Sequence, residues 1–184
     1  MTAAKRTGGR LLADQLRVHG AGHIFGVPGE SYLAVLDALY DYREAMPFIA
    51  CRHEGGAAMM AEAYGKLSGR PGICMVTRCP GAANASAGVH VARQDSTPMI
   101  LFIGQVGRGF RDREAFQETD FRQMFAPLAK WVAQIDDAAR IPEYVSRAFH
   151  TAVSGRPGPV VLALPEDMLR EEARAADPRP YERI

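Results

Sequence analysis

Residues 71–106 read PGICMVTRCPGAANASAGVHVARQDSTPMILFIGQV, and this stretch decides the fold. Its first apolar run (71–77) and its last (97–106) have the length and composition of buried strands. Between them, residues 82–95 are rich in small residues and are typical of a helix. Strands that are apolar on both faces and joined through a helix are characteristic of a covered parallel sheet. The stretch therefore predicts a strand–helix–strand unit at the centre of an α/β domain.

The same alternation of apolar runs and helical segments continues on both sides of this stretch. We expect further strands at residues 23–29, 46–52, 128–135 and 156–165. We expect further helices at residues 11–20, 31–42, 54–68 and 136–155, and towards the end of 107–125. Ser31 should cap the helix that it begins, and Gly69 should end the helix over 54–68. The predicted fold is a three-layer α/β domain with a mainly parallel six-stranded sheet and helices on both faces.

Composition and charge narrow the classes of function. Lys and Arg number 22 and Asp and Glu 21, so the net charge of +1 argues against nucleic-acid binding. No apolar run approaches the ~20 residues of a membrane span, so no membrane partner is expected. The three cysteines, Cys51, Cys74 and Cys79, form no C-x-x-C pair, which favours reduced thiols, no metal site and a cytoplasmic location.

Parallel sheets bind ligands beyond the carboxyl ends of their strands, so the loops that follow the strands are the candidate site. No G-x-G-x-x-G, no G-x-x-x-x-G-K-[ST] and no G-x-S-x-G occurs in them. Dinucleotide-binding, P-loop and α/β-hydrolase functions are therefore disfavoured.

Glu54 is the most informative residue in these loops. It stands where an apolar strand ends and a helix of small and apolar residues begins. A first-turn acid also stabilises a helix through the backbone dipole, and this ordinary role explains Glu54 equally well. However, Ala57, Ala61 and Gly65 form a stripe of small residues that would let another helix or a subunit approach closely. An acid in such a dry place is suited to holding or sharing a proton.

Six segments occur together in an informative order and spacing: FGVPGES, RHEGGAAMMAEAYGKLSGRPGICMVT, CPGAAN, DSTPMILFIGQV, EAFQE and SGRPGPVVLALPEDM. With them, the chain resembles the pyrimidine-binding domain of thiamine-diphosphate enzymes over about residues 9–170. It is most similar to acetolactate (acetohydroxyacid) synthase large subunits. The resemblance implies an N-terminal domain over residues 1–170. It also implies that the charged tail, 171–184, begins a linker towards a central domain.

The resemblance also implies roles for single residues. Glu54 matches the glutamate that hydrogen-bonds N1′ of the aminopyrimidine and promotes removal of the C2 proton of the thiazolium. Gln117 matches a second catalytic position. The implied contacts to the cofactor are Val27, Pro28, Gly29, Glu54, Pro80 and Asn84, and the implied contacts to substrate are Phe116, Gln117 and Lys130.

The implied partners lie mostly outside this sequence. The family acts on 2-keto acids by decarboxylation and carboligation, as dimers or tetramers. Each site lies between this domain and the diphosphate-binding domain of a partner subunit. Mg²⁺, and in some members FAD, binds through domains whose motifs do not occur here, so the isolated chain is expected to be inactive.

Two features keep other assignments open. The usual S-G-P-G turn is replaced by Arg78-Cys79-Pro80-Gly81, and Gly107 replaces a proline. A 2-keto acid decarboxylase, a split-subunit enzyme and a non-catalytic assembly module therefore remain alternatives. Glu30 matches an acid of the decarboxylases, whereas Gln105-Val106 stands where they carry a His-His pair.

Overall fold

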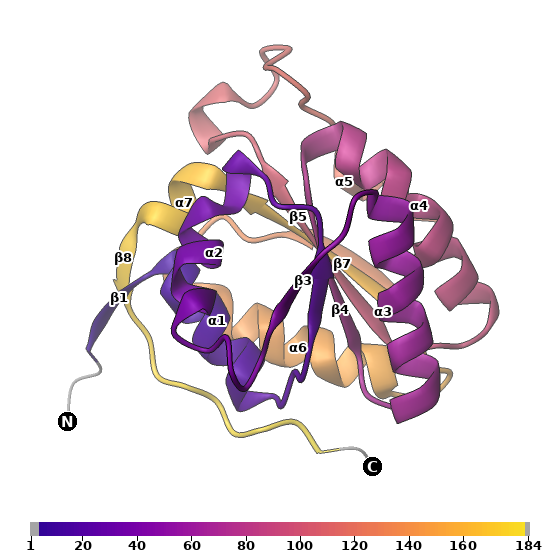
Figure 1. Cartoon of the computed structure of the whole chain (residues 1–184). Helices are drawn as coiled ribbons and strands as arrows, with labels where there is room; N and C mark the ends of the chain where they lie inside the picture. Colours follow the sequence, from indigo (N-terminus) through magenta and orange to yellow (C-terminus); the bar gives the residue numbers. More distant parts are fainter. Residues whose placement is uncertain (1–3, 183–184) are drawn as a thin grey trace.

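The computed structural model describes residues 4–182, and its centre is a six-stranded parallel sheet (Figure 1). The strand order is β3-β2-β4-β5-β7-β6, and every neighbouring pair is parallel. The strands are β2 (Ile24–Gly26), β3 (Phe48–Ala50), β4 (Gly72–Thr77), β5 (Met99–Gln105), β6 (Trp131–Gln134) and β7 (Pro159–Pro165). All six predicted strands are present within slightly wider predicted bounds, so the predicted sheet is confirmed.

Helices cover both faces of this sheet, which confirms the three-layer prediction (Figure 1). The α-helices are α1 (Gly8–Val18), α2 (Leu33–Tyr40), α3 (Glu54–Ser68), α4 (Arg78–Gln94), α5 (Phe121–Phe125), α6 (Ile141–Val153) and α7 (Glu166–Arg170). Short 3₁₀ helices lie at Glu30–Tyr32, Arg108–Phe110 and Ala138–Arg140. Alternate residues of β4 show the two layers: Ile73 and Met75 pack with α1, α2 and α6, whereas Cys74 and Val76 pack with α3, α4 and α5.

Helix α3 has the predicted bounds, and Gly69 ends it with a left-handed φ of 68°. Its stripe of small residues lies inside the domain, because Ala57, Ala61 and Gly65 are buried. A Cβ atom added at Gly65 would lie 2.2 Å from the carbonyl oxygen of Pro98. The stripe therefore admits the domain's own backbone, and the prediction that it receives a subunit is wrong.

A second, two-stranded sheet joins residues near the two ends of the chain. Strand β1 (Lys5–Thr7) pairs antiparallel with β8 (Glu172–Arg174). The side chain of Arg6 contacts Asp14 at 2.6 Å and Asp177 at 2.9 Å. The tail after residue 170, expected to begin a linker, thus lies along the domain as far as the structure describes it. A domain boundary at residue 170 stays a prediction.

Ser31 does not cap α2 as predicted. It lies in the 3₁₀ helix that precedes α2, and its hydroxyl group forms a hydrogen bond with the hydroxyl group of Thr77 at the end of β4. The contact connects the loop after β2 to the loop after β4. Among the described helices, none combines the length and apolar content needed to cross a membrane.

Candidate functional site

The candidate site lies at the carboxyl edge of the sheet, between β2 and β4. These neighbouring strands lead to opposite faces, because β2 continues into α2 and β4 continues into α4. Such a switch in direction opens a crevice where α/β sheets bind ligands. The loop after β2 reaches β4 at Gly29, where an added Cβ atom would lie 2.4 Å from the Cβ of Thr77. Only glycine permits this approach, so Gly29 holds the loop Val27–Gly29 at the switch point.

Glu54 is the first residue of α3, and two neighbours define its position. His53 caps the helix, since its Nδ1 accepts a hydrogen bond from the backbone N–H of Gly55 at 3.0 Å. The side-chain amide of Asn84 donates to Oε2 of Glu54 at 2.9 Å. Glu54 is half-buried, and within residues 4–182 it has no ion-pair partner and no hydrogen bond to Oε1. The carboxylate is therefore oriented without being neutralised.

The first turn of α4 lies next to this carboxylate. A Cβ atom added at Gly81 would lie 3.6 Å from Oε1 of Glu54. Pro80 lies one residue before Gly81 and is exposed, as is Asn84. The structure thus places Asn84 and Gly81 of α4 against Glu54, the first residue of α3, with Pro80 next to Gly81 in the chain.

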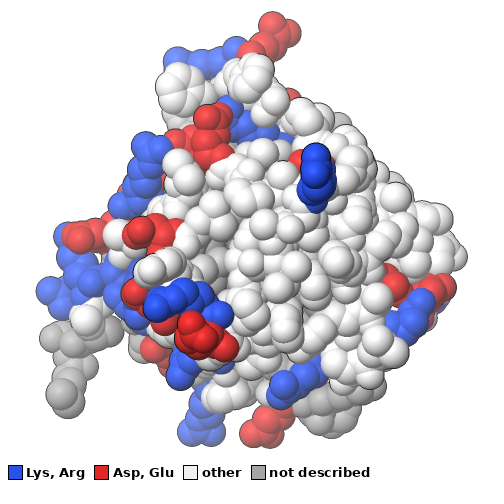
Figure 2. All heavy atoms as spheres, in the orientation of Figure 1, with Lys and Arg blue, Asp and Glu red and all other residues white. Residues whose placement is uncertain are grey.

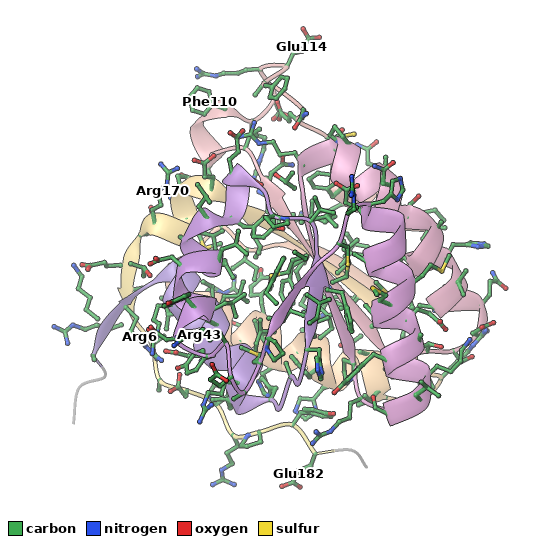
Figure 3. The ribbon with its side chains drawn as sticks, viewed as in Figure 1. Arg6, Arg43, Phe110, Glu114, Arg170 and Glu182 are labelled. Carbon is green, nitrogen blue, oxygen red and sulfur yellow. The ribbon has the colours of Figure 1, made fainter. Side chains whose placement is uncertain are left out.

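The loop from residue 107 to residue 120 carries Phe116 and Gln117 to the same edge. The backbone N–H of Cys79 donates to the carbonyl oxygen of Gln117 at 3.1 Å, and Gln117 has a left-handed φ of 63°. Phe116 is 71% exposed. The loop projects beyond the sheet, with Glu114 at its tip (Figure 3). Both residues therefore lie beside the α4 turn.

Glu118 organises this loop from within. Its carboxylate accepts hydrogen bonds from the backbone N–H groups of Asp112 at 2.7 Å and Ala115 at 3.1 Å. These backbone hydrogen bonds, the one from Asp112 first, lower the pKa of Glu118. The side chain of Gln105 donates to the carbonyl oxygen of Thr119 at 2.8 Å, which ties the loop to β5.

Lys130 does not belong to this site. It precedes β6, and its backbone N–H donates to the carbonyl oxygen of Pro159, the first residue of β7. It therefore lies at the amino edge of the sheet, opposite Glu54. Its ammonium group donates to the carbonyl oxygens of Thr151 and, at 2.7 Å, Ser154, at the end of α6. Burial, with a contribution from nearby Arg93, lowers the pKa of Lys130. The structure therefore separates Lys130 from Phe116 and Gln117, the other implied contacts to substrate, and gives it a structural role at the end of α6.

Arg78 and Tyr32 were not among the predicted site residues, yet both help to build the site. Tyr32 is buried, and its hydroxyl group donates to the carbonyl oxygen of Val27. Arg78 begins α4 and its Nη1 donates to the carbonyl oxygen of Phe116 at 3.3 Å. The sequence signal for Arg78 was its departure from the S-G-P-G turn. Among the described residues, no group of three or more His, Cys, Asp or Glu is placed to hold a metal ion.

A switch point in the strand order, with an oriented acid that has no ion-pair partner among the described residues, is typical of a ligand-binding α/β domain. Comparison with protein families identifies which one. Residues 6–124 match the family described as thiamine pyrophosphate enzyme, N-terminal TPP binding domain, and the chain belongs to this family. Thiamine pyrophosphate is another name for thiamine diphosphate.

Curated relatives extend the likeness over most of the chain. It is 41% identical to the mitochondrial acetolactate synthase catalytic subunit of Aspergillus candidus, over 94% of this chain and 25% of that protein. It is 42% identical to the acetolactate synthase large subunit of Lactococcus lactis, over 88% and 28% respectively. It is 37% identical to the acetolactate synthase of Bacillus subtilis, over 91% of this chain and 29% of that protein. The chain thus spans between a quarter and a third of the length of these relatives.

Proposed function

We propose that this chain supplies the pyrimidine-binding half of the active site of a thiamine-diphosphate enzyme that decarboxylates and ligates 2-keto acids, as the names of its relatives suggest. One observation carries the proposal: Glu54 lies at the switch point, oriented by Asn84 and without an ion-pair partner among the described residues. An acid in that position is available for proton exchange with a ligand.

The residues present fit an aminopyrimidine ring. Oε1 of Glu54 is free to meet a ring nitrogen, because Asn84 engages only Oε2. Glu54 would hold the proton that this oxygen shares with the ring. Val27, Pro28 and Gly29 would lie against the ring from the loop after β2, and Pro80 from the turn after β4. When bound, thiamine diphosphate supplies the electron sink for decarboxylation of the keto acid.

Phe116 and Gln117 would lie on the substrate side of the site. The hydrogen bond from Cys79 to Gln117 supports this placement, because it joins their loop to the turn that contains Pro80. Gln117 would position the reacting groups and Phe116 would exclude water.

The domain forms half of a site. Glu54 is half-buried, and Asn84 and Pro80 are exposed, so water reaches all three in the chain alone. A proton shared between a carboxylate and a ring nitrogen requires a drier environment. We propose that a diphosphate-binding domain of a partner subunit covers this edge, and that Mg²⁺ and, where present, FAD bind through domains other than this one.

An exposed apolar face supports assembly into dimers or tetramers. Figure 2 shows a broad area over β3 and α3 with few charged side chains, and charges gather around its margin. The outward side of α3 contributes Met59, Met60 and Leu67, and Leu67 is 89% exposed. Apolar patches of this kind commonly mark protein interfaces.

The free thiols Cys51, Cys74 and Cys79 support a reducing location such as the cytoplasm.

The test is turnover of pyruvate by the complete protein, in which this chain is joined to the diphosphate-binding domain. With thiamine diphosphate and Mg²⁺ we expect release of carbon dioxide and formation of acetolactate, and none from the 184-residue chain alone. Carbon dioxide without acetolactate would indicate a decarboxylase. Absence of turnover with any small 2-keto acid would contradict the proposal and favour a non-catalytic assembly module.

A further inference from the structure

Arg78 is held in an unfavourable backbone conformation at the start of α4. Its φ is 43°, in the left-handed region that non-glycine residues rarely adopt. Its side chain is only 11% exposed, although arginine side chains are mostly exposed in proteins. Strained and buried residues of this kind concentrate at binding sites.

The guanidinium group of Arg78 does not use all of its N–H donors in hydrogen bonds within the described residues. Its Nη2 lies 3.3 Å from Oε1 of Glu30 and 3.3 Å from Oε2 of Glu166. Its Nη1 donates to the carbonyl oxygen of Phe116. The Nε atom is buried and finds no acceptor within residues 4–182. A buried donor without an acceptor is costly, so an oxygen ligand at this position would stabilise the site.

Arg78 lines a cavity of about 300 Å³, a size that suits a small organic ligand. The walls combine charged and apolar groups. The charged groups are Arg78, Glu166, Asp167 and Arg170, and the remaining walls are Val106, Gly107, Phe110, Ala115 and Phe116. Figure 3 shows Phe110 and Arg170, which come from the loop after β5 and from α7. The cavity thus suits a small molecule that has both a polar group and an apolar part.

We infer that this cavity binds the carboxylate of a small carboxylic acid and that Arg78 is the residue that recognises it. The inference rests on the proposed function, which identifies the acid as a 2-keto acid substrate. An arginine fork binds a carboxylate through two parallel hydrogen bonds, and the Nε–H of Arg78 supplies one of them.

The neighbouring carboxylates are compatible with this assignment. Glu30 is 68% exposed, so water can hydrate it when an incoming carboxylate takes its place beside Nη2. Glu166 also pairs with Arg170 and keeps that partner. Asp167 pairs with Arg108 and keeps that partner too. A cationic ligand would leave the Nε–H without an acceptor.

The cavity is connected to the loop that we assign to substrate. The carbonyl oxygen of Phe116 accepts from Arg78, and the next residue along each segment forms the Cys79–Gln117 hydrogen bond. Arg78 also begins the helix in which Gly81 lies against Glu54. A carboxylate bound at Arg78 would therefore be held beside Phe116 and Gln117, and Arg78 would determine specificity for anionic substrates.

The test is an NMR titration of the ¹⁵N-labelled full chain with pyruvate, without thiamine diphosphate. We expect saturable shifts of the Arg78 Nε–H signal and of the backbone amides of Cys79 and Gln117. Binding should weaken at least about 10-fold in Arg78→Gln and also in Arg78→Lys, which keeps the charge but loses the fork. The matched control is Arg111→Gln, a loop arginine outside the cavity, which should bind like the wild type.

Three results would overturn the inference: no saturable binding, equal binding by Arg78→Gln, or binding of the uncharged ester methyl pyruvate as tightly as pyruvate. Tighter binding of inorganic phosphate than of any carboxylate would also overturn it. If the variants do not fold, the wild-type protein still tests the inference, because pyruvate must shift the Arg78 Nε–H signal in a saturable way. Because no cofactor is present, failure here leaves the turnover test of the proposed function intact. Saturable binding without turnover would instead support the carboxylate site and reject the proposed function.

Discussion

Asn84 and Glu54 belong to different helices and meet in one hydrogen bond, from Nδ2 of Asn84 to Oε2 of Glu54 at 2.9 Å. The helices that carry them, α3 and α4, pack closely: a Cβ atom added at Gly88 would lie 2.5 Å from the Cβ of Ala58. The orientation of the proposed proton-sharing oxygen therefore depends on how these two helices pack.

Replacing Asn84 by Ala should release the Glu54 carboxylate. In the complete protein we expect exchange of the cofactor's C2 proton to slow about 10-fold or more, because a hydrogen bond to a charged group contributes about 1.5–3 kcal/mol. Exchange is followed by NMR in deuterated buffer. Ser86→Ala is the control, because the Ser86 hydroxyl group lies in the same helix and donates to the carbonyl oxygen of Ala83. An unchanged exchange rate in Asn84→Ala would show that Asn84 does not orient the carboxylate.

The packing of α3 on α4 can be tested with two glycines. Gly88→Ala should destabilise the chain by about 1–3 kcal/mol, because the new methyl group overlaps Ala58. Gly56→Ala is the matched control, because an added Cβ there has nothing within 4 Å. That change should be neutral or should stabilise by up to about 1 kcal/mol through helix propensity. Urea unfolding measures both, and equal effects would contradict the described contact between α3 and α4.

Much of the fold could be predicted because local signals agree with tertiary packing. The apolar runs that contain β4, β5 and β7 are buried in the sheet almost throughout, as expected for parallel strands that are covered on both faces. Gly69 marks the end of α3 because the chain turns there through a left-handed φ. Glu54 was singled out from its place between strand and helix, and the structure adds its orientation by Asn84.

The remaining features depend on contacts that no local pattern reveals. Strands β1 and β8 are three residues each and lie far apart in the sequence, so neither shows a periodicity. Helix α1 begins with Gly8 and Gly9, although glycine is a poor helix former. Glycine is needed at position 9 because a Cβ there would lie 2.2 Å from the carbonyl oxygen of Ala34. Helix α4 begins at Arg78, before the predicted residue 82, since Pro80 is tolerated in a first turn.

Glu118→Gln should loosen the loop that carries Phe116 and Gln117. The neutral amide accepts the backbone hydrogen bonds of Asp112 and Ala115 less strongly than the carboxylate does. We expect amide hydrogen exchange over residues 112–117 to accelerate roughly 3- to 10-fold. Glu114→Gln, at the exposed tip of the same loop, should leave exchange unchanged. Equal exchange in both variants would show that Glu118 does not organise the loop.

Stability should fall in mild acid because of His19. Burial, with a smaller contribution from His150, lowers the pKa of His19 to about 4. Its Nδ1 accepts the backbone N–H of Tyr181 at 3.1 Å, and its ring stacks on Phe149. The unfolded chain takes up the proton near pH 6.5, so below that pH the unfolded state binds more protons and the free energy of unfolding decreases.

The loss attributable to His19 should reach about 2 kcal/mol by pH 5. Urea unfolding between pH 7 and pH 5 measures it. The variant His19→Gln removes the titrating ring and should show a correspondingly flatter dependence on pH. Parallel curves for the variant and the wild type would contradict the assignment of this loss to His19.

Glu54→Gln in the complete protein tests the central claim most directly, by NMR measurement of C2-proton exchange of bound thiamine diphosphate in deuterated buffer. The glutamine side chain keeps the shape but cannot share a proton with the ring, so we predict that exchange falls at least about 100-fold. The unfolding midpoint should change little, because Glu54 has no ion-pair partner among the described residues. Exchange at the wild-type rate in a folded Glu54→Gln protein would contradict the account.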